Sequence, residues 1–231
     1  LPACTLLPLP ETQTGGVAAQ ALGDVLAAPA TAVLAGCGMG NTADTMGLVE
    51  GLLAKANCPL VLDADALNVL AGHLEEGDDE AVHHVGLAAL EAATGPVVLT
   101  PHVGGMARLC GKPAADILAA PAAVAAEFSA AHGCVVVLKS HAAVVAAPNG
   151  EVYGLQTNGN PGLAKGGSGD VLAGIIAALV AQGIDAAQAA AAAVWLHAKA
   201  GALAAQTYGE AGMSPADLPL QLCEVWKQLD R

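Results

Sequence analysis

Aromatic side chains are scarce in this chain of 231 residues: they make up 2% of it, although hydrophobic residues make up 55%. Alanine, leucine and valine must therefore fill the core, and its packing depends on the close approach of helices rather than on large rings. The chain is long enough for one large domain with a substantial core, and no linker-like stretch divides it in two.

Positive charge is also scarce, with eight Lys and Arg against 21 Asp and Glu and a formal net charge of -13. Non-specific binding to nucleic acid or to an anionic membrane surface needs clustered Lys and Arg, so the sequence argues against both classes of partner. A phosphorylated ligand would have to be held by backbone amides, by a few lysines and by a metal ion.

The sequence contains no C-x-x-C pair. Its six scattered cysteines are too few to indicate a disulfide-rich scaffold in a chain of this length. We interpret them as reduced, small apolar core residues of a cytoplasmic protein. No uninterrupted apolar run reaches the ~18 residues that suggest a membrane span. The start also lacks the basic region and apolar core of a signal peptide.

Short apolar segments alternate with helical ones along most of the chain. This alternation predicts an α/β fold with a mainly parallel sheet, right-handed crossovers and helices on both faces. Asn149-Gly150 predicts a small antiparallel hairpin. The proline-punctuated residues 1–16 are expected to hold a short edge strand, and the acidic residues 75–80 a solvated loop. The expected strands are residues 31–36, 60–63, 97–100, 135–139, 142–146 and 152–155.

A glycine-rich loop, which begins at Asn158, precedes an apolar helical segment that ends near residue 182. Free amides at a helix start favour a phosphate, and glycines let the backbone approach it closely. Asp170 lies in the first turn, where it either caps the helix or accepts a proton from a hydroxyl that attacks phosphorus. Because five glycines, a lysine and this carboxylate occur together, we favour a phosphate site over a merely capped helix.

Other polar residues follow the remaining strands, at the edge where open α/β sheets bind ligands. The turn that contains Gly38 has G-x-G-x-G spacing, which does not support a dinucleotide fingerprint. Asp65 follows the second strand, where a ligand contact and a plain helix N-cap are equally open interpretations. His102 lies just past the end of the third strand and Lys139 ends the fourth, and for His102 we favour a ligand contact. For His197 we favour a hydrogen-bonded core histidine.

Several stretches, in the same order, resemble the ADP-dependent NAD(P)H-hydrate dehydratases of the ribokinase-like superfamily. They include D-A-D-A-L-N at residues 63–68, T-P-H at 100–102 and the run G-N-P-G-L-A-K-G-G-S-G-D-V-L-A-G at 159–174. W-L-H at 195–197 and G-M-S-P-A-D-L at 212–218 also match. The resemblance implies one ribokinase-like domain over residues 1–231, without the further strand and glycine-rich turn with which family domains usually begin.

The resemblance also implies a reaction, in which the S-epimer of NADH or NADPH hydrate is dehydrated while ADP, or ATP, is consumed to AMP, or ADP, and phosphate. Asp170 would be the catalytic base, with Mg²⁺ present, and relatives often form homo-oligomers such as tetramers. The implied nucleotide contacts are Lys139, Ser140, His141, Ala142, Ala143, Gly166, Gly167, Ser168 and Gly169. The implied substrate contacts are Gly38, Gly40, Asp65, His102 and Asp170. No residues are assigned to a dedicated metal site.

Two motifs depart from the family pattern. After T-P-H the family continues Pro-Gly-Glu, whereas this chain has Val103-Gly104-Gly105. The family shows Lys-Gly-Ala-x-Thr where residues 139–143 read K-S-H-A-A. Two other functions therefore stay open: a superfamily kinase of a sugar, a thiazole alcohol or a pyrimidine, and a nucleotide-binding relative without catalysis. The D-A-D-A-L-N and G-N-P-G runs favour the dehydratase over the kinase.

Overall fold

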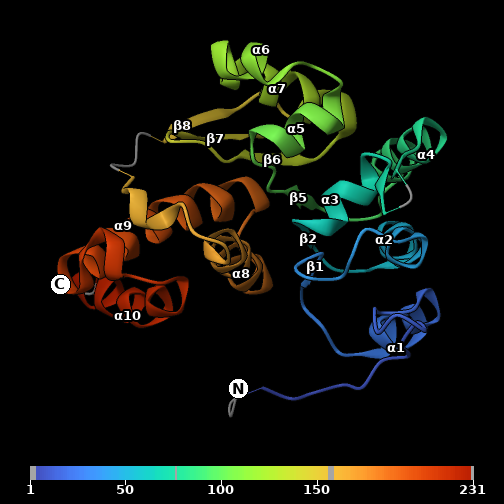
Figure 1. Ribbon diagram of the computed structural model, residues 1–231, viewed down its shortest axis with the longest axis horizontal. Coiled ribbons are helices and arrows are strands. Elements are labelled where there is room, and N and C mark those ends of the chain that lie inside the picture. Colours follow the sequence, from blue (N-terminus) through green and yellow to red (C-terminus); the bar gives the residue numbers. More distant parts are fainter. Residues whose placement is uncertain (1–3, 76, 156–158, 230–231) are drawn as a thin grey trace.

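A six-stranded sheet forms the centre of the computed structural model, which describes residues 4–75, 77–155 and 159–229 (Figure 1). The outer residues of the expected domain, Leu1 and Arg231, and Asn158 at the start of the glycine-rich loop lie outside these ranges. The strands, in spatial order, are β1 (Val33–Ala35), β2 (Leu60–Leu62), β5 (Val97–Leu99), β6 (Val135–Leu138), β7 (Ala143–Ala146) and β8 (Val152–Leu155).

The strand directions confirm the expected α/β class. β1, β2, β5 and β6 pair in parallel, whereas β7 and β8 are antiparallel to their neighbours and form the hairpin around Asn149-Gly150. The strands at the centre are buried on both faces, which is why they read as continuous apolar runs.

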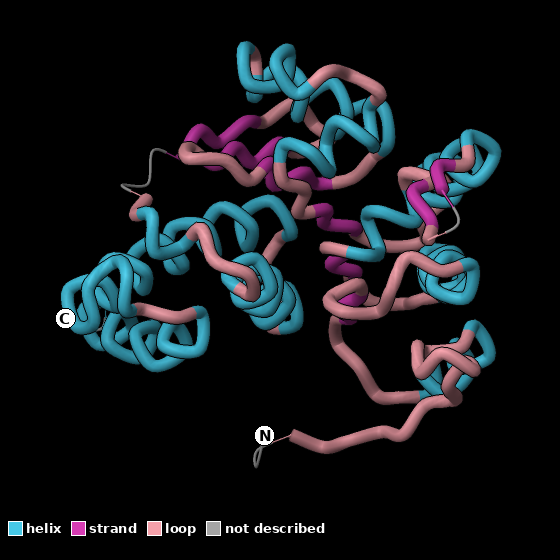
Figure 2. The backbone as a smooth tube through the Cα atoms, in the orientation of Figure 1, coloured by secondary structure: helices cyan, strands magenta, loops and turns pink. Residues whose placement is uncertain are grey.

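Helices cover both faces of the sheet, and strand side chains alternate between the two cores (Figure 2). Leu60 and Leu62 face one core, while Val61 between them faces the other. The first core is closed by α2 (Ala43–Lys55), α3 (Asp65–Leu70), α4 (Glu80–Glu91), α5 (Val103–Cys110), α6 (Ala114–Ala119) and α7 (Pro121–His132). The second is closed by α8 (Ser168–Ala181), α9 (Ala186–Gly212) and α10 (Leu218–Leu229).

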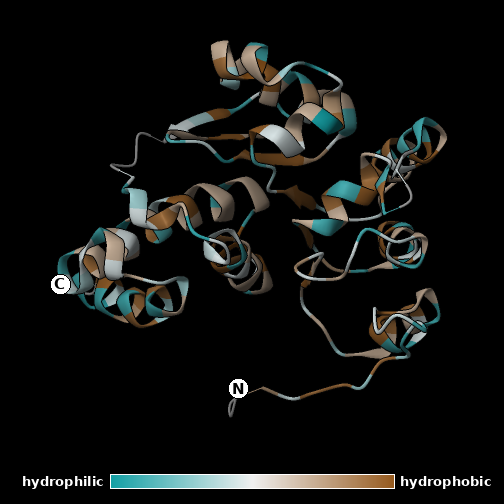
Figure 3. Ribbon diagram, viewed as in Figure 1, coloured by the Kyte–Doolittle hydropathy of each residue, from teal (hydrophilic) through white to brown (hydrophobic). Residues whose placement is uncertain are grey.

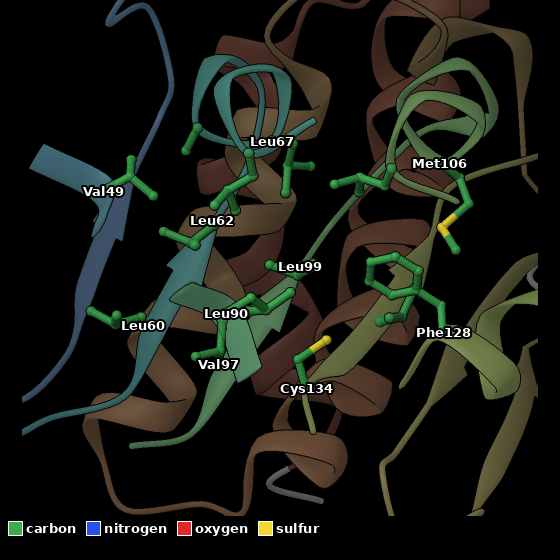
Figure 4. Close-up of a cluster of buried hydrophobic side chains, with 14 of the residues drawn as sticks. Val49, Leu60, Leu62, Leu67, Leu90, Val97, Leu99, Met106, Phe128 and Cys134 are labelled. Atoms are coloured by element: carbon green, nitrogen blue, oxygen red, sulfur yellow. The ribbon is translucent and has the colours of Figure 1, made fainter. Parts of the chain in front are cut away.

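Small residues fill the second core, as the shortage of aromatics predicts. Ala173 of α8 and Ala189, Ala193 and Ala200 of α9 are fully buried. The first core contains larger side chains, among them Leu62, Leu99 and the chain's one phenylalanine, Phe128 (Figure 4). Figure 3 shows that hydrophobic residues dominate the strands between the two helical layers.

Shorter elements complete the described chain. The 3-10 turns are η1 (Ala19–Ala21), η2 (Pro161–Leu163) and η3 (Pro215–Asp217). Helix α1 (Leu22–Ala27) packs on α2, and β3 (His73–Leu74) pairs with β4 (Gly77–Asp78) as a two-stranded ribbon. None of the described helices combines the length and the apolar character that crossing a membrane requires.

Three local expectations were wrong. Residues 4–16 form no edge strand, because their only ladder contact is an isolated bridge between Glu11 and Val17. The described part of residues 75–80 is not a plain loop: residues 77–78 form β4, and Asp79 then accepts hydrogen bonds from two amides as the N-cap of α4. All six cysteines are free, yet Cys4 and Cys223 are exposed rather than buried in a core.

Candidate functional site

The polar loops that follow β1, β2, β5 and β6 meet at one edge of the sheet, as expected for parallel strands. The amide of Gly40, after β1, donates to Asp65 Oδ2 after β2 at 2.8 Å. His102, after β5, forms a parallel bridge with Lys139 after β6. The N-terminus of α8 closes the group, because Gly169 lies against the side chain of Lys139. One site therefore draws on five segments of the chain.

An ion pair between Asp63 and Lys139 lies at the base of this site. Lys139 Nζ is 2.9 Å from Asp63 Oδ1 and 3.0 Å from Oδ2, and Asp63 is only 3% exposed. A Cβ added to Gly169 would lie 3.0 Å from Lys139 Nζ, so the glycine lets the ammonium approach α8. An ammonium group has three donors, and its cationic charge here adds to the positive end of the helix.

The first turn of α8 presents free amides, which favours the phosphate-site interpretation over a capped helix. Its N-cap, Gly167, has a positive φ of 94° and provides no side-chain cap. The amides of Gly169 and Asp170 find no acceptor among the described residues, and the Asp170 side chain is exposed. Lys165, however, does not contribute: its Nζ donates to the carbonyl oxygens of Glu210, Ala211 and Met213 at the end of α9.

A cavity of about 680 Å³ opens beside this turn, a volume typical of small-molecule sites. Six of the nine expected nucleotide contacts line it: Lys139, Ser140, His141, Ala143, Ser168 and Gly169. Ala142, Gly166 and Gly167 do not line it. Leu163, Leu172 and Val194 give the cavity an apolar wall.

None of the five expected substrate contacts lines this cavity; they lie in the loops after β1 and β5 and at the starts of α3 and α8. Asp65 is not an N-cap: that position belongs to Ala64, which has no capping side chain, and Asp65 instead holds the Gly40 amide. Ala64 itself has a φ of 49° and a ψ of -116°, an unusual backbone conformation of the kind that clusters at functional sites.

His102 is exposed and serves as the N-cap of α5, since its Nδ1 accepts the Gly105 amide at 3.2 Å. Although the residue is exposed, partial removal of the ring from water, and then the positive charges of Arg108 and Lys139, lower the pKa of His102, while Asp63 acts in the opposite direction. The ring is therefore neutral at pH 7, and with Nδ1 as acceptor its proton is on Nε2. Nε2 is left as a donor for a ligand.

Sequence reasoning missed two groups at the site. Cys37 lies in the glycine turn after β1, and its Sγ falls within 4.8 Å of one oxygen each of Asp63 and Asp170. Burial, followed by the charges of Asp170 and Asp63, raises the pKa of this thiol to about 12. A second group joins α5, α3 and the loop after β1: Arg108 Nη2 donates to Asn68 Oδ1 at 2.8 Å, and Asn68 Nδ2 donates to Asn41 Oδ1 at 3.2 Å. No spacing in the sequence predicts either set.

Cys37, Asp63 and Asp170 do not suit a dedicated Mg²⁺ site. Mg²⁺ requires oxygen ligands in near-octahedral geometry, whereas one member of this set is a protonated thiol. Lys139 also occupies both oxygens of Asp63. We therefore derive no catalytic step through a metal held by these side chains.

His197 is hydrogen-bonded, as expected, and its bond anchors the start of α8. Its Nε2 donates to the Ser168 carbonyl oxygen at 3.0 Å, and the ring also lines the cavity. Burial lowers the pKa of His197 from its ordinary value of 6.5, so the native protein binds this proton less readily than the unfolded chain.

We expect His197→Gln to reduce the amount of folding stability that the protein loses at acid pH. A lowered folded-state pKa means that the contribution of His197 is complete above pH 6.5 and declines as the pH falls below it. Glutamine can still donate to Ser168 but does not titrate. Thermal denaturation at pH 7.5 and pH 5 should show a smaller fall in Tm for this variant than for the wild type. His84→Gln is the matched control, because the side chain of His84 is 74% exposed; an equal reduction by both variants would contradict the assignment.

Comparisons with known proteins agree on one family. The sequence profile of the NAD(P)H-hydrate dehydratases matches residues 7–223. The bifunctional NAD(P)H-hydrate repair enzyme of Moorella thermoacetica is 42% identical over 91% of this chain, and the ADP-dependent (S)-NAD(P)H-hydrate dehydratase of Xanthomonas campestris is 36% identical over all of it. The chain spans 37% of the first protein and 74% of the second.

Solved structures give the same result. The ADP/ATP-dependent NAD(P)H-hydrate dehydratase from Bacillus subtilis, co-crystallised with ATP and Mg²⁺, has a TM-score of 0.71 and 32% identity, with 86% of this chain and 64% of that one covered. A ribokinase-like superfamily protein from Enterococcus faecalis has a TM-score of 0.67 and 29% identity, with 86% and 63% covered. The expected ribokinase-like fold is confirmed, and the chain belongs to the NAD(P)H-hydrate dehydratase family.

Proposed function

We propose that the protein dehydrates the S-epimer of NADH or NADPH hydrate with ADP or ATP as the phosphate donor, and so repairs damaged nicotinamide cofactor. The observation that carries this proposal is the position of Asp170. Its exposed carboxylate lies beside the free amides of α8, between the 680 Å³ cavity and the loops after β1 and β5. The carboxylate as base, the amides as phosphate site and the nucleotide-sized cavity are therefore adjacent.

In the proposed reaction, Asp170 accepts the proton of the ring hydroxyl as that oxygen attacks the terminal phosphoryl group of the nucleotide. A new oxygen–phosphorus bond forms and the bond to the nucleotide leaving group breaks. The ring nitrogen then expels the phosphate ester by breaking the carbon–oxygen bond. Loss of a proton from the adjacent ring carbon restores the double bond of the dihydronicotinamide, and phosphate is released.

The residues around Asp170 would stabilise the charge that develops on the transferred phosphoryl group. The amides of Gly169 and Asp170 have no other acceptor among the described residues, and the Lys139 ammonium lies beside them. Hydrogen-bond donors that are already in position do not have to reorganise when negative charge develops on the phosphoryl group. Because the side chains do not suit a magnesium site, we propose that Mg²⁺ enters bound to the nucleotide phosphates.

We propose that the adenine nucleotide occupies the cavity and the hydrated dinucleotide the opposite side of Asp170. The apolar wall of Leu163, Leu172 and Val194 suits a flat heterocycle. On the substrate side, His102 Nε2 and the Gly38 amide supply donors, whereas the amides of Met39 and Gly40 are already bonded within the protein. The homo-oligomer implied by the family resemblance stays a prediction.

The decisive experiment mixes purified protein with the S-epimer of NADH hydrate and with either ADP or ATP. Return of the near-ultraviolet absorption of the reduced nicotinamide, dependent on nucleotide, is the expected result. The donor that supports the faster return would be identified at the same time. No return, with nucleotide binding confirmed separately by calorimetry, would overturn the proposal in favour of a kinase or of a relative without catalysis.

A further inference from the structure

The position of Cys37 is determined by the turn on both sides of it. Gly36, just before it, packs against the Asp63 carbonyl oxygen so closely that a Cβ would overlap that atom. After it, the Gly40 amide is bound to Asp65, and the Met39 carbonyl oxygen accepts from Thr45 Oγ1 at 3.2 Å. The thiol therefore belongs to a rigid turn and not to a mobile loop.

Three charged groups face this thiol from different elements. Asp63 approaches from the end of β2, Lys139 from the end of β6, and Asp170 from α8. Asp63 and Lys139 also influence the pKa of His102, which forms a backbone bridge with Lys139. Lys139 bonds both oxygens of Asp63, so the charge of Asp63 is already compensated. Asp170 has no ion-pair partner among the described residues.

The thiol keeps its proton at neutral pH, because burial and the nearby carboxylates raise its pKa to about 12. It is therefore neither a thiolate nucleophile nor a good metal ligand. A protonated thiol beside a carboxylate can only donate, and the Sγ of Cys37 lies within 4.8 Å of a carboxylate oxygen of Asp170.

We propose that Cys37 is a positioning residue, whose S–H donates to the carboxylate of Asp170 and aims it at the substrate hydroxyl. The inference rests on the proposed function of Asp170 as the base. A carboxylate on an exposed first turn samples several rotamers, and one donor held by a rigid turn selects among them.

The first test compares Cys37→Ala with Cys37→Ser in the dehydration assay. We expect alanine, which removes the donor, to lower kcat about tenfold with KM nearly unchanged, as for the loss of a hydrogen bond to a charged group. Serine, which restores a donor of similar size, should recover kcat to within about threefold of the wild type. If Cys37 only fills space, Cys37→Ala should have the higher kcat of the two variants, because a buried apolar site accepts alanine more readily than serine. That reversed order would overturn the proposal.

A second test does not depend on turnover. In ¹³C NMR of protein labelled at the aspartate carboxyl carbons, the Asp170 signal is assigned by its absence from Asp170→Asn. Its chemical shift at pH 7.5 should change in Cys37→Ala, which removes the donor, and stay near the wild-type value in Cys37→Ser. An unchanged chemical shift in both variants overturns the inference even if the enzyme is active. A changed chemical shift in a protein without dehydratase activity would support the contact while the proposed function failed.

Discussion

Asp170→Asn is expected to lower turnover by about 10²–10⁴-fold, the usual contribution of a positioned general base, while nucleotide affinity changes little. Asparagine has the same shape but cannot accept the hydroxyl proton. The nucleotide contacts would remain, since Lys139, the α8 amides and the cavity wall do not depend on this carboxylate. The measurement is kcat in the hydrate assay beside the dissociation constant of the adenine nucleotide from calorimetry.

The matched control for that experiment is Asp185→Asn, which alters another helix-terminal carboxylate. Asp185 caps α9 by accepting the amides of Ala187 and Gln188 and does not line the cavity. It should change stability slightly and turnover hardly at all. If Asp170→Asn lost turnover and nucleotide binding to the same degree, Asp170 would be structural and the proposed base would be wrong.

Gly36→Ala is expected to remove most of the folding stability, about 4 kcal/mol or more. The residue has a φ of 117°, which L side chains rarely adopt. An added Cβ would also overlap the Asp63 carbonyl oxygen and lie 2.7 Å from the Ala66 Cβ and 2.8 Å from the Ala66 amide nitrogen. These atoms belong to the β2–α3 junction, so the clash cannot be relieved by rotating a flexible side chain.

Urea denaturation followed by circular dichroism measures this effect. Gly111→Ala is the matched control, because Gly111 also has a positive φ, 67°, but a Cβ there would meet nothing within 4 Å. It should cost about 1–2 kcal/mol, from the backbone conformation alone. Equal losses in the two variants would mean that the β1 turn relaxes and that Gly36 does not hold it against β2.

The location of the candidate site at one edge of the sheet was largely predictable, because its loops follow recognisable strands. Apolar runs before Asp63, His102 and Lys139 predict parallel strands, and parallel strands bring their carboxyl ends to one edge. The glycine-rich start of α8 was equally clear, since glycine clusters and a missing capping side chain are local features. The individual roles were less predictable. Lys165, in the same loop, caps α9 and does not face the phosphate site.

The α/β class, the hairpin, the small-residue core and the family follow from the sequence alone, because the spacing of apolar residues, the turn residues and the ordered motifs are all local features. Three other features exist only in the folded chain: Lys139 pairs with Asp63, 76 positions away, Asp65 holds the Gly40 amide, and Cys37 Sγ lies within 4.8 Å of an Asp170 oxygen. These contacts join loops of different strands. Their geometry depends on strand order and on side-chain rotamers, and no local pattern of residues encodes either.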